Sequence, residues 1–408
     1  MLTPFQNQYD LTKYINYMLI GYAFSLPISK AGISFFEVFM LILWLLEGAW
    51  KDKFKVLKND LLSMSIVLLI AVSLIASLWS VNIPYALDYV GKYRHFLVIL
   101  IIYTSFDKKY IQHVFSAFLI GMLISEIFSY GIFFEIFTYK DVSPSDPSPF
   151  MDHTNYSAYL AFTSIILLTR FFNSLELTSK IIYALFFITV TGNLFINGGR
   201  TGQVIFVVLL IITFILSLKS KLKAIVYSVI ILGCIFLSAY SLSQNFNERT
   251  NQAITDAQQM IYDNNYRGSF STRVALWLVG FDKFSENILL GSGIGNEMND
   301  IKKYATQRGF EEHLIGYADH HNSFVTFAVQ LGIVGVFLCI MIFYSLVKLR
   351  FSSYEFKVLN ITFYTTFFLL SMIGISFHLM NSMVFFALFA GLLNKISFFE
   401  KGKEGLEV

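Results

Sequence analysis

The chain has 408 residues, of which 56% are hydrophobic and only 14% are charged, with a net charge of +3. An ordinary globular domain carries about 25% charged residues, and a chain of this length cannot enclose so many apolar side chains in a soluble interior. This composition excludes a soluble enzyme and a disordered chain. Two cysteines are also too few for a disulfide scaffold. We therefore expect an all-α polytopic membrane protein.

Crossing a hydrocarbon core of roughly 30 Å takes about 20 apolar residues. On that length the sequence predicts about twelve transmembrane helices in a single transmembrane domain over residues 1–408. The predicted spans cover residues 12–29, 32–50, 61–79, 90–106, 110–137, 153–172, 180–198, 201–218, 223–242, 322–347, 357–377 and 380–397. The fourth span is the weakest, because Lys92, Arg94 and His95 crowd its start.

The distribution of basic residues predicts the orientation. Eighteen of the 30 Lys and Arg residues lie on alternate loops or near the termini, and loops rich in Lys and Arg stay in the cytoplasm. Both termini are therefore expected in the cytoplasm, which agrees with an even number of spans. The other twelve basic residues fall on the opposite face and need a different explanation.

Seven of those twelve lie in one long polar loop, residues 243–320, between the ninth and tenth spans. Long loops in compact membrane or soluble domains are usually functional. Residues 251–263 and 271–285 read as short amphipathic helices, with Trp277 and Phe281 on the apolar side. We expect a large, partly helical loop on the outer face of the membrane.

A first candidate site is the turn Asn197-Gly-Gly-Arg-Thr-Gly202. Arg200 lies at the outer membrane edge, between glycines that permit close approach of another group, and Thr201 begins the next helix. A guanidinium beside a helix N-terminus suits a phosphate. The alternative is an arginine that only reaches toward the interface from a helix end.

The long loop holds two further motifs. Arg273, in Ser271-Thr-Arg-Val-Ala-Leu-Trp277, is either an anion-binding residue or a solvated residue of an amphipathic helix. The glycines of Leu290-Gly-Ser-Gly-Ile-Gly-Asn296 invite a nucleotide interpretation, but they lack a βαβ context. A flexible turn that shapes the loop is the better interpretation.

The string Asp319-His-His-Asn322 leads into the tenth span. A histidine at this position can be a general base whose tautomer is fixed by its polar neighbours, or it can be an interfacial residue. No spacing of Cys, His or carboxylate residues argues for a metal site, and no phosphate-binding glycine loop followed by Lys occurs. We expect no metal, no cofactor and no nucleic-acid partner.

Taken together, these motifs resemble the bacterial O-antigen ligase family, part of a superfamily that also holds O-antigen polymerases and some protein O-oligosaccharyltransferases. The resemblance rests on the Gly-Arg-Thr-Gly turn, Arg273 in a large outer loop, and His321-Asn-Ser-Phe-Val followed by Gln330-Leu-Gly-Ile-Val-Gly335. It covers about residues 195–335. Arg200, Arg273 and His321 match the positions of the family's essential residues.

The resemblance implies a GT-C-like membrane fold in the bacterial inner membrane with a periplasmic active site. Such ligases move a glycan from undecaprenyl pyrophosphate to lipid A-core oligosaccharide, without metal and with inversion. Arg200 and Arg273 would bind the pyrophosphate, and His321 would accept the proton of the acceptor hydroxyl. The adjacent His320 leaves open which ring is the base. Weaker candidates for substrate binding are Lys92, Arg94, His153, Asp319, His320 and Asn322.

Alternatives from the same superfamily are an O-antigen polymerase and a protein glycosyltransferase, which use the same kind of donor. A lipid or solute transporter is the alternative from another class, since twelve spans with cytoplasmic termini is a common transporter topology. Against it, the sequence shows no pair of Gly- or Pro-broken spans in corresponding halves.

Overall fold

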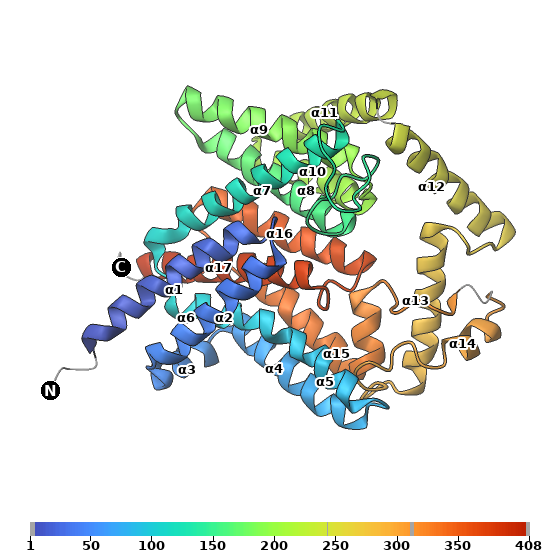
Figure 1. Cartoon of the computed structure of the whole chain (residues 1–408), viewed down its shortest axis with the longest axis horizontal. Helices are drawn as coiled ribbons and strands as arrows, with labels where there is room; N and C mark the ends of the chain where they lie inside the picture. Colours follow the sequence, from blue (N-terminus) through green and yellow to red (C-terminus); the bar gives the residue numbers. More distant parts are fainter. Residues whose placement is uncertain (1–4, 243, 311–313, 405–408) are drawn as a thin grey trace.

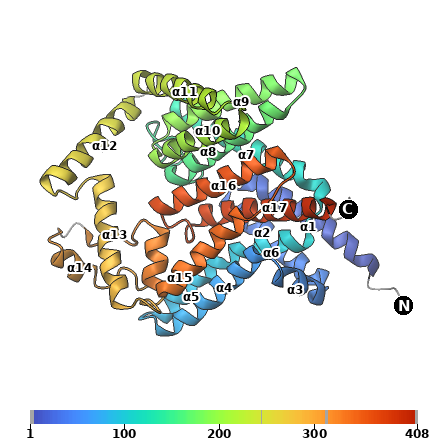
Figure 2. The ribbon, with the colours of Figure 1, turned by 180° about the vertical axis from the view of Figure 1, so that it is seen from behind.

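The computed structural model describes residues 5–242, 244–310 and 314–404 of the chain. Within these ranges every regular element is a helix, which confirms the all-α class. Most helices pack side by side in one bundle, and three helices of the long loop lie at one edge of it (Figure 1). The view from behind shows the same arrangement (Figure 2).

Eight helical segments in the described part of the chain are long and apolar enough to cross a membrane. They are α4 (Leu61–Ala76) with the 3-10 turn η1 (Ser77–Trp79), η3 (Lys108–Tyr110) with α7 (Ile111–Phe133), α9 (Leu177–Ile196), α10 (Arg200–Ser217), α11 (Lys221–Leu242), α15 (Ser323–Val347), α16 (Tyr354–Ile373) and α17 (Met380–Glu404). They coincide with eight of the twelve expected spans. The chain is thus a polytopic membrane protein.

The expected span 32–50 is shorter than predicted. Helix α2 (Lys30–Glu47) ends at Gly48, and α3 (Trp50–Lys58) leaves it at an angle of 111°. The backbone turns at Gly48 and Ala49, whose φ angles are +71° and +54°. If this bent pair is one span, the structure holds nine candidates.

The expected span 90–106 is broken into short pieces. Helix α5 (Ile83–Gly91) is followed by the 3-10 helix η2 (Lys92–Phe96) and by α6 (Leu97–Ser105). The last two run alongside α17. At one end Lys92 Nζ lies 3.1 Å from His378 Nε2, and at the other Lys395 Nζ donates to the Tyr103 carbonyl at 2.7 Å.

The two remaining expected spans form helices that carry more polar side chains than the other spans. They are α1 (Phe5–Ser25) and α8 (His153–Asn173). Helix α8 is surrounded by protein: residues 155–169 are buried, and Ser382 Oγ donates to Asn155 Oδ1 at 2.6 Å. Its composition is therefore set by protein neighbours rather than by lipid, so a count based on hydropathy omits it.

Aromatic packing around α8 and α17 accounts for much of the large phenylalanine content. Phe162 of α8 contacts Phe389 of α17 edge to face, with ring centroids 4.9 Å apart. Phe363 of α16 and Phe385 of α17 complete the group. Such pairs add roughly 0.5–1.5 kcal/mol beyond the area that they bury. These contacts pack α8, α16 and α17 against one another.

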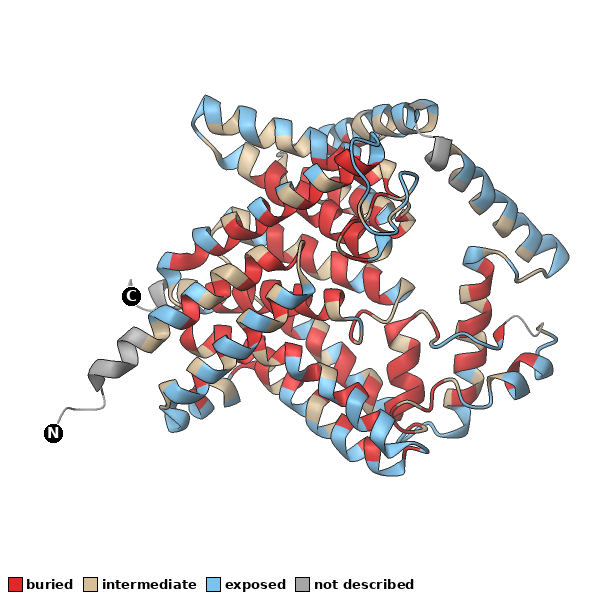
Figure 3. Cartoon of the chain, viewed as in Figure 1, coloured by how far each residue is buried: buried red, intermediate tan, exposed pale blue. Residues whose placement is uncertain are grey.

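The long loop folds into α12 (Gln244–Asp263), α13 (Ser269–Glu286) and α14 (Ile301–Gln307), which confirms the two expected amphipathic helices. Residue 243 and residues 311–313 of this loop lie outside the described residues. The loop has a small core of its own around Leu276, Val279 and Tyr304, whereas α12 is largely exposed (Figure 3). The prediction for Phe281 was wrong: this ring is 53% exposed, because it lies away from that small core.

Candidate functional site

Arg273 lies on the first half of α13, on the side that faces the entry to α15. Its side chain is half-buried, and among the described residues no carboxylate lies within 4.0 Å of it. Burial lowers the pKa of Arg273, while Tyr317 and Asp319 act in the opposite direction. A guanidinium is charged at any physiological pH, so this position presents a cation with free donors beside Tyr317 and Asp319.

Three other basic residues of the long loop have structural partners. Lys303 Nζ lies 2.8 Å from Glu286 Oε1, and Arg308 donates to both carboxylate oxygens of Asp282. Lys283 is buried and donates to the carbonyls of Asn296 and Asn299 at 2.5 and 2.6 Å. These cations hold the loop together, which sets them apart from Arg273.

His321 is held by Asp319 at the end of the long loop. The backbone N–H of His321 donates to Asp319 Oδ1 at 2.6 Å, and its ring Nδ1 lies 3.3 Å from the same oxygen. The Tyr317 ring meets the imidazole edge to face, with centroids 5.6 Å apart. A carboxylate at Nδ1 favours the tautomer with its proton on Nδ1, which leaves Nε2 as a proton acceptor.

His320 points the other way, into protein. Its side chain is buried, and the Cα of Gly280 on α13 is so close that a Cβ there would lie 2.7 Å from the imidazole. Burial, with the nearby Lys283 and His321, lowers the pKa of His320 to about 3. The two neighbouring histidines are thus in different environments, and only His321 is open to solvent, with 36% of its side chain exposed.

The third member of the string, Asn322, is the N-cap of α15. Its Oδ1 accepts from the backbone N–H groups of Phe324 and Val325 at 2.9 and 3.2 Å. This bonding satisfies two helix-terminal donors, which is the usual role of Asn at this position. Its side chain is therefore engaged by the helix and sets where α15 begins.

The glycine turn at 291–295 is docked on a break in α15. Gly332 has φ +66° inside α15, and the N–H of Gly293 donates to the Gln330 carbonyl at 3.0 Å. In return, Ile333 N–H donates to the Ile288 carbonyl at 2.7 Å. A Cβ on Gly332 would come within 2.5 Å of the Leu289 backbone. Glycine is required here because two backbones touch.

Arg200 is the first residue of α10, one residue before the expected start at Thr201. The glycines around it admit helix α8: a Cβ on Gly199 or on Gly202 would lie 2.2–2.4 Å from atoms of His153 and Ser157. The Gly202 N–H donates to Ser157 Oγ at 3.1 Å. Close helix packing thus explains these glycines, and it fixes the position from which Arg200 extends.

The candidate His153 lies beside the same turn. Its Nδ1 is 2.9 Å from Asp146 Oδ2, and Asp146 Oδ1 accepts from the Gly198 N–H at 3.0 Å. Burial opposes ionisation of Asp146, but these hydrogen bonds outweigh it and lower the pKa of Asp146. The rigid outer loop 143–149 is in this way attached to the Arg200 turn.

Helix α12 connects the Arg200 turn with α13. Arg200 Nη2 donates to Gln252 Oε1 of α12 at a long 3.4 Å, and Asp256 of the same helix accepts from the Ser269 N–H at 2.9 Å. The structure therefore brings Arg273, Asp319 and His321 together. Arg200 is connected to them through α12.

The two remaining candidates, Lys92 and Arg94, lie on η2. Arg94 is exposed and donates to the Gly91 carbonyl at 3.4 Å. Lys92 contacts His378, whose ring stacks on Tyr89 at a centroid distance of 3.6 Å. Sequence reasoning missed His378 and Tyr317, because single aromatic residues in short loops carry no spacing signal.

The comparisons with known proteins agree with this location. No curated protein matches the chain significantly. A family model described as O-antigen ligase matches residues 184–340, the segment that contains Arg200, Arg273 and His321 and excludes Lys92, Arg94 and His153. This match agrees, over that segment, with the resemblance to the O-antigen ligase family.

Proposed function

We propose that the protein is an O-antigen ligase, a glycosyltransferase that moves a glycan from undecaprenyl pyrophosphate to lipid A-core oligosaccharide. The observation that carries this proposal is the placement of Arg273, which has no carboxylate within 4.0 Å among the described residues, near the Asp319–His321 pair. A cation such as Arg273 can bind an anionic donor, and the Asp319–His321 pair can accept the proton of an acceptor hydroxyl. The family match over residues 184–340 supports the same class of reaction.

In the proposed reaction, Nε2 of His321 accepts the proton of the acceptor hydroxyl as that oxygen attacks the anomeric carbon. The bond from this carbon to the pyrophosphate oxygen breaks, and undecaprenyl pyrophosphate leaves with the bonding electrons. Attack from the side opposite the leaving group inverts the anomeric carbon. Arg273 and Arg200 bind the pyrophosphate and stabilise its growing charge. Asp319 stabilises the imidazolium that forms.

The test is transfer by the purified full chain from a defined undecaprenyl-pyrophosphate glycan to lipid A-core. Arg273→Gln and His321→Gln are each expected to lower the rate at least about a hundredfold, or about 2.7 kcal/mol. Arg267→Gln, which removes an exposed arginine from the same loop, serves as the matched control and is expected to stay within about twofold of wild type. Wild-type rates in both site variants would refute the mechanism.

An O-antigen polymerase or a protein O-oligosaccharyltransferase of the same superfamily is the second candidate. These activities share the donor, so the acceptor decides between them. A polymerase elongates lipid-linked glycan in the absence of lipid A-core, whereas a ligase does not. A protein glycosyltransferase modifies a pilin or similar protein and leaves lipopolysaccharide unchanged in a deletion strain.

We further propose that the chain crosses the inner membrane twelve times in a GT-C-like arrangement, with the long loop and the site in the periplasm. The segment 92–105 runs along α17 between the contacts Lys92–His378 and Tyr103–Lys395, so it covers the same depth as a candidate span. Labelling of single cysteines at Lys58 and Arg308 tests the orientation. A periplasmic reagent is expected to reach position 308 and not position 58.

A further inference from the structure

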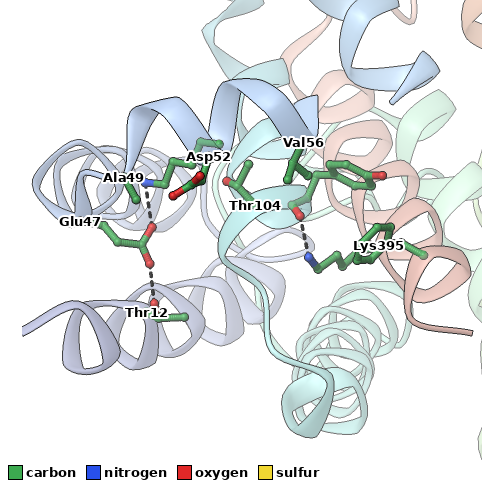
Figure 4. Close-up of a pocket in the computed structure, with 10 residues that line it drawn as sticks. Thr12, Glu47, Ala49, Asp52, Val56, Thr104 and Lys395 are labelled. Atoms are coloured by element: carbon green, nitrogen blue, oxygen red, sulfur yellow. Dashed lines mark hydrogen bonds and ion pairs between the residues drawn. The ribbon is translucent and has the colours of Figure 1, made fainter. Parts of the chain in front are cut away.

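A second polar site lies at the end of the bundle away from His321. Helices α1, α2, α3, α6 and α17 enclose an open cavity of about 420 Å³ there (Figure 4). Helix α17 begins beside the loop that accepts a hydrogen bond from Ser323, at Gly374. Lys395 of the cavity lies fifteen residues after Met380, or about 22 Å further along the helix. This cavity is therefore separate from the candidate active site.

Lys395 presents an ammonium group to this cavity with few protein partners. The side chain is buried, with 7% of the residue exposed. Its Nζ donates to the Tyr103 carbonyl and lies 5.0 and 4.9 Å from the centres of the Phe398 and Phe399 rings. No described carboxylate lies within 4.0 Å of it, and the buried Asp60 acts on it only from a longer distance. Since an ammonium has three donors and a buried charge is costly when unpaired, the position favours an anionic ligand.

The other charges of the cavity form a neutral pair and one exposed acid. Lys53 Nζ lies 2.8 Å from Glu47 Oε2 and also donates to the Trp44 carbonyl at 2.8 Å. Glu47 accepts a further bond from Ser105 at 2.5 Å, so this pair is satisfied within the protein. Asp52 is exposed and lines the cavity on the Glu47 side, with Lys395 on the other side (Figure 4). The cavity thus offers a cation and an anion to one ligand.

Helix α3, which forms one wall, has the composition of a helix at a membrane surface. Trp50 and Phe54 are 45% and 69% exposed, and the exposed lysines of α3 are Lys51, Lys55 and Lys58. A short helix with aromatic and basic residues lies in the interface plane, and its 111° bend from α2 permits that position. The exposed Leu45 and Leu46 of α2 precede it. Lipid headgroups are therefore the ligands nearest to this cavity.

We propose that the cavity binds the headgroup of a zwitterionic aminophospholipid, with its phosphodiester on Lys395 and its amine on Asp52. The acyl chains lie along the exposed leucines of α2. The charges of the ligand and of the two side chains are complementary, which favours an aminophospholipid over an anionic lipid that lacks the amine. That this is the cytoplasmic leaflet rests on the orientation proposed above, whereas the binding itself does not depend on transferase activity.

The experiment is native mass spectrometry of the full chain in detergent, titrated with phosphatidylethanolamine or phosphatidylglycerol of matched acyl chains. Phosphatidylethanolamine is expected to bind about tenfold more tightly, and Lys395→Gln is expected to weaken both lipids about tenfold, as for loss of a charged hydrogen bond. Asp52→Asn is expected to remove the preference between the lipids. Lys58→Gln, an exposed lysine of α3 with the same charge change, is the control and is expected to match wild type.

Equal binding of both lipids by the wild-type chain would overturn the assignment of the amine to Asp52. Lipid binding by Lys395→Gln that equals the Lys58→Gln control would overturn the phosphate site. Competition by soluble phosphoethanolamine at the same concentration as the lipid would show a soluble ligand and reject a lipid. If Lys395→Gln does not fold, Lys395→Arg keeps the cation and must retain lipid binding. Asp52→Asn then still tests whether the preference between the two lipids depends on this carboxylate. These lipid-binding results do not depend on transferase activity, so a failure of the proposed transferase function would not change them.

Discussion

Replacing Asp319 by Asn tests the pairing of carboxylate and imidazole directly. The amide keeps an oxygen that can accept the backbone N–H of His321, which now donates to Asp319 at 2.6 Å. It removes the negative charge 3.3 Å from Nδ1. The ring geometry is thus largely preserved, while the imidazolium that forms during proton transfer loses its counter-charge. The substitution therefore separates positioning of the base from its electrostatic support.

The expected size follows from Coulomb's law. Two unit charges at this distance interact by about 1 kcal/mol in water and by about 5 kcal/mol at an effective dielectric constant near 20. His321 is about one third exposed and Asp319 is mostly buried, so an intermediate loss of about 2–3 kcal/mol is expected. That loss corresponds to a rate of transfer about 30- to 160-fold lower at saturating donor and acceptor.

The assay is single-turnover transfer from a labelled undecaprenyl-pyrophosphate glycan, with thermal stability measured on the same samples. Asp300→Asn is the matched control: it makes the same charge change in the same loop, at an exposed position with φ +63° that Asn tolerates. A rate within twofold of wild type for Asp319→Asn would refute the role given to the pair. An effect on KM alone, with kcat unchanged, would instead assign Asp319 to substrate binding.

Three further substitutions test the supports of the site. Gly332→Ala should lower the unfolding free energy by about 1–3 kcal/mol, because its Cβ would clash with the Leu289 backbone. Gly233→Ala, with open space around it, is the control in the same thermal melt. Asn322→Ala should cost about 1 kcal/mol through loss of the cap and Asn322→Asp much less, measured the same way. His320→Gln should keep transfer within about threefold of wild type in folded protein, since its ring faces α13, and a hundredfold loss would assign the base to His320.

The sequence was sufficient to locate most of the long helices, including the buried α8, but not the break of segment 90–106 into short helices. Apolar runs predicted α9, α10 and α15 within a few residues of their observed ends. Segment 90–106 and α8 carry more polar side chains than the other spans, and protein neighbours satisfy these polar groups. Ser382 bonds to Asn155 of α8, for example. The partners of these polar groups are hundreds of residues away in the chain, so a local window of hydropathy cannot identify the partners.

The site shows the same division. Chemistry and position in the chain were enough to single out Arg273 and the Asp-His-His-Asn string. They could not distinguish His320 from His321, since the two differ only in what each ring meets after folding: Gly280 for the first and Asp319 for the second. The need for glycine at position 332 could not be predicted either, because glycine is common in apolar helices. It is required there because the backbone of Leu289 lies against it after folding.

The glycine turn explains how a polar loop outside the bundle can hold His321 and Arg273 in fixed positions. Lys283 bonds α13 to the end of the turn, and the turn bonds to the break at Gly332 in α15. Asn322 fixes the start of the same helix, next to His321. The positions of Arg273 and His321 are thus both fixed by attachment to α15, although the two residues are 48 positions apart in the sequence. The turn that carries Arg200 is instead attached to α8, through the hydrogen bond from Gly202 to Ser157. In the proposed reaction, a donor that engages both arginines would therefore bridge two separately supported parts of the chain, which α12 connects.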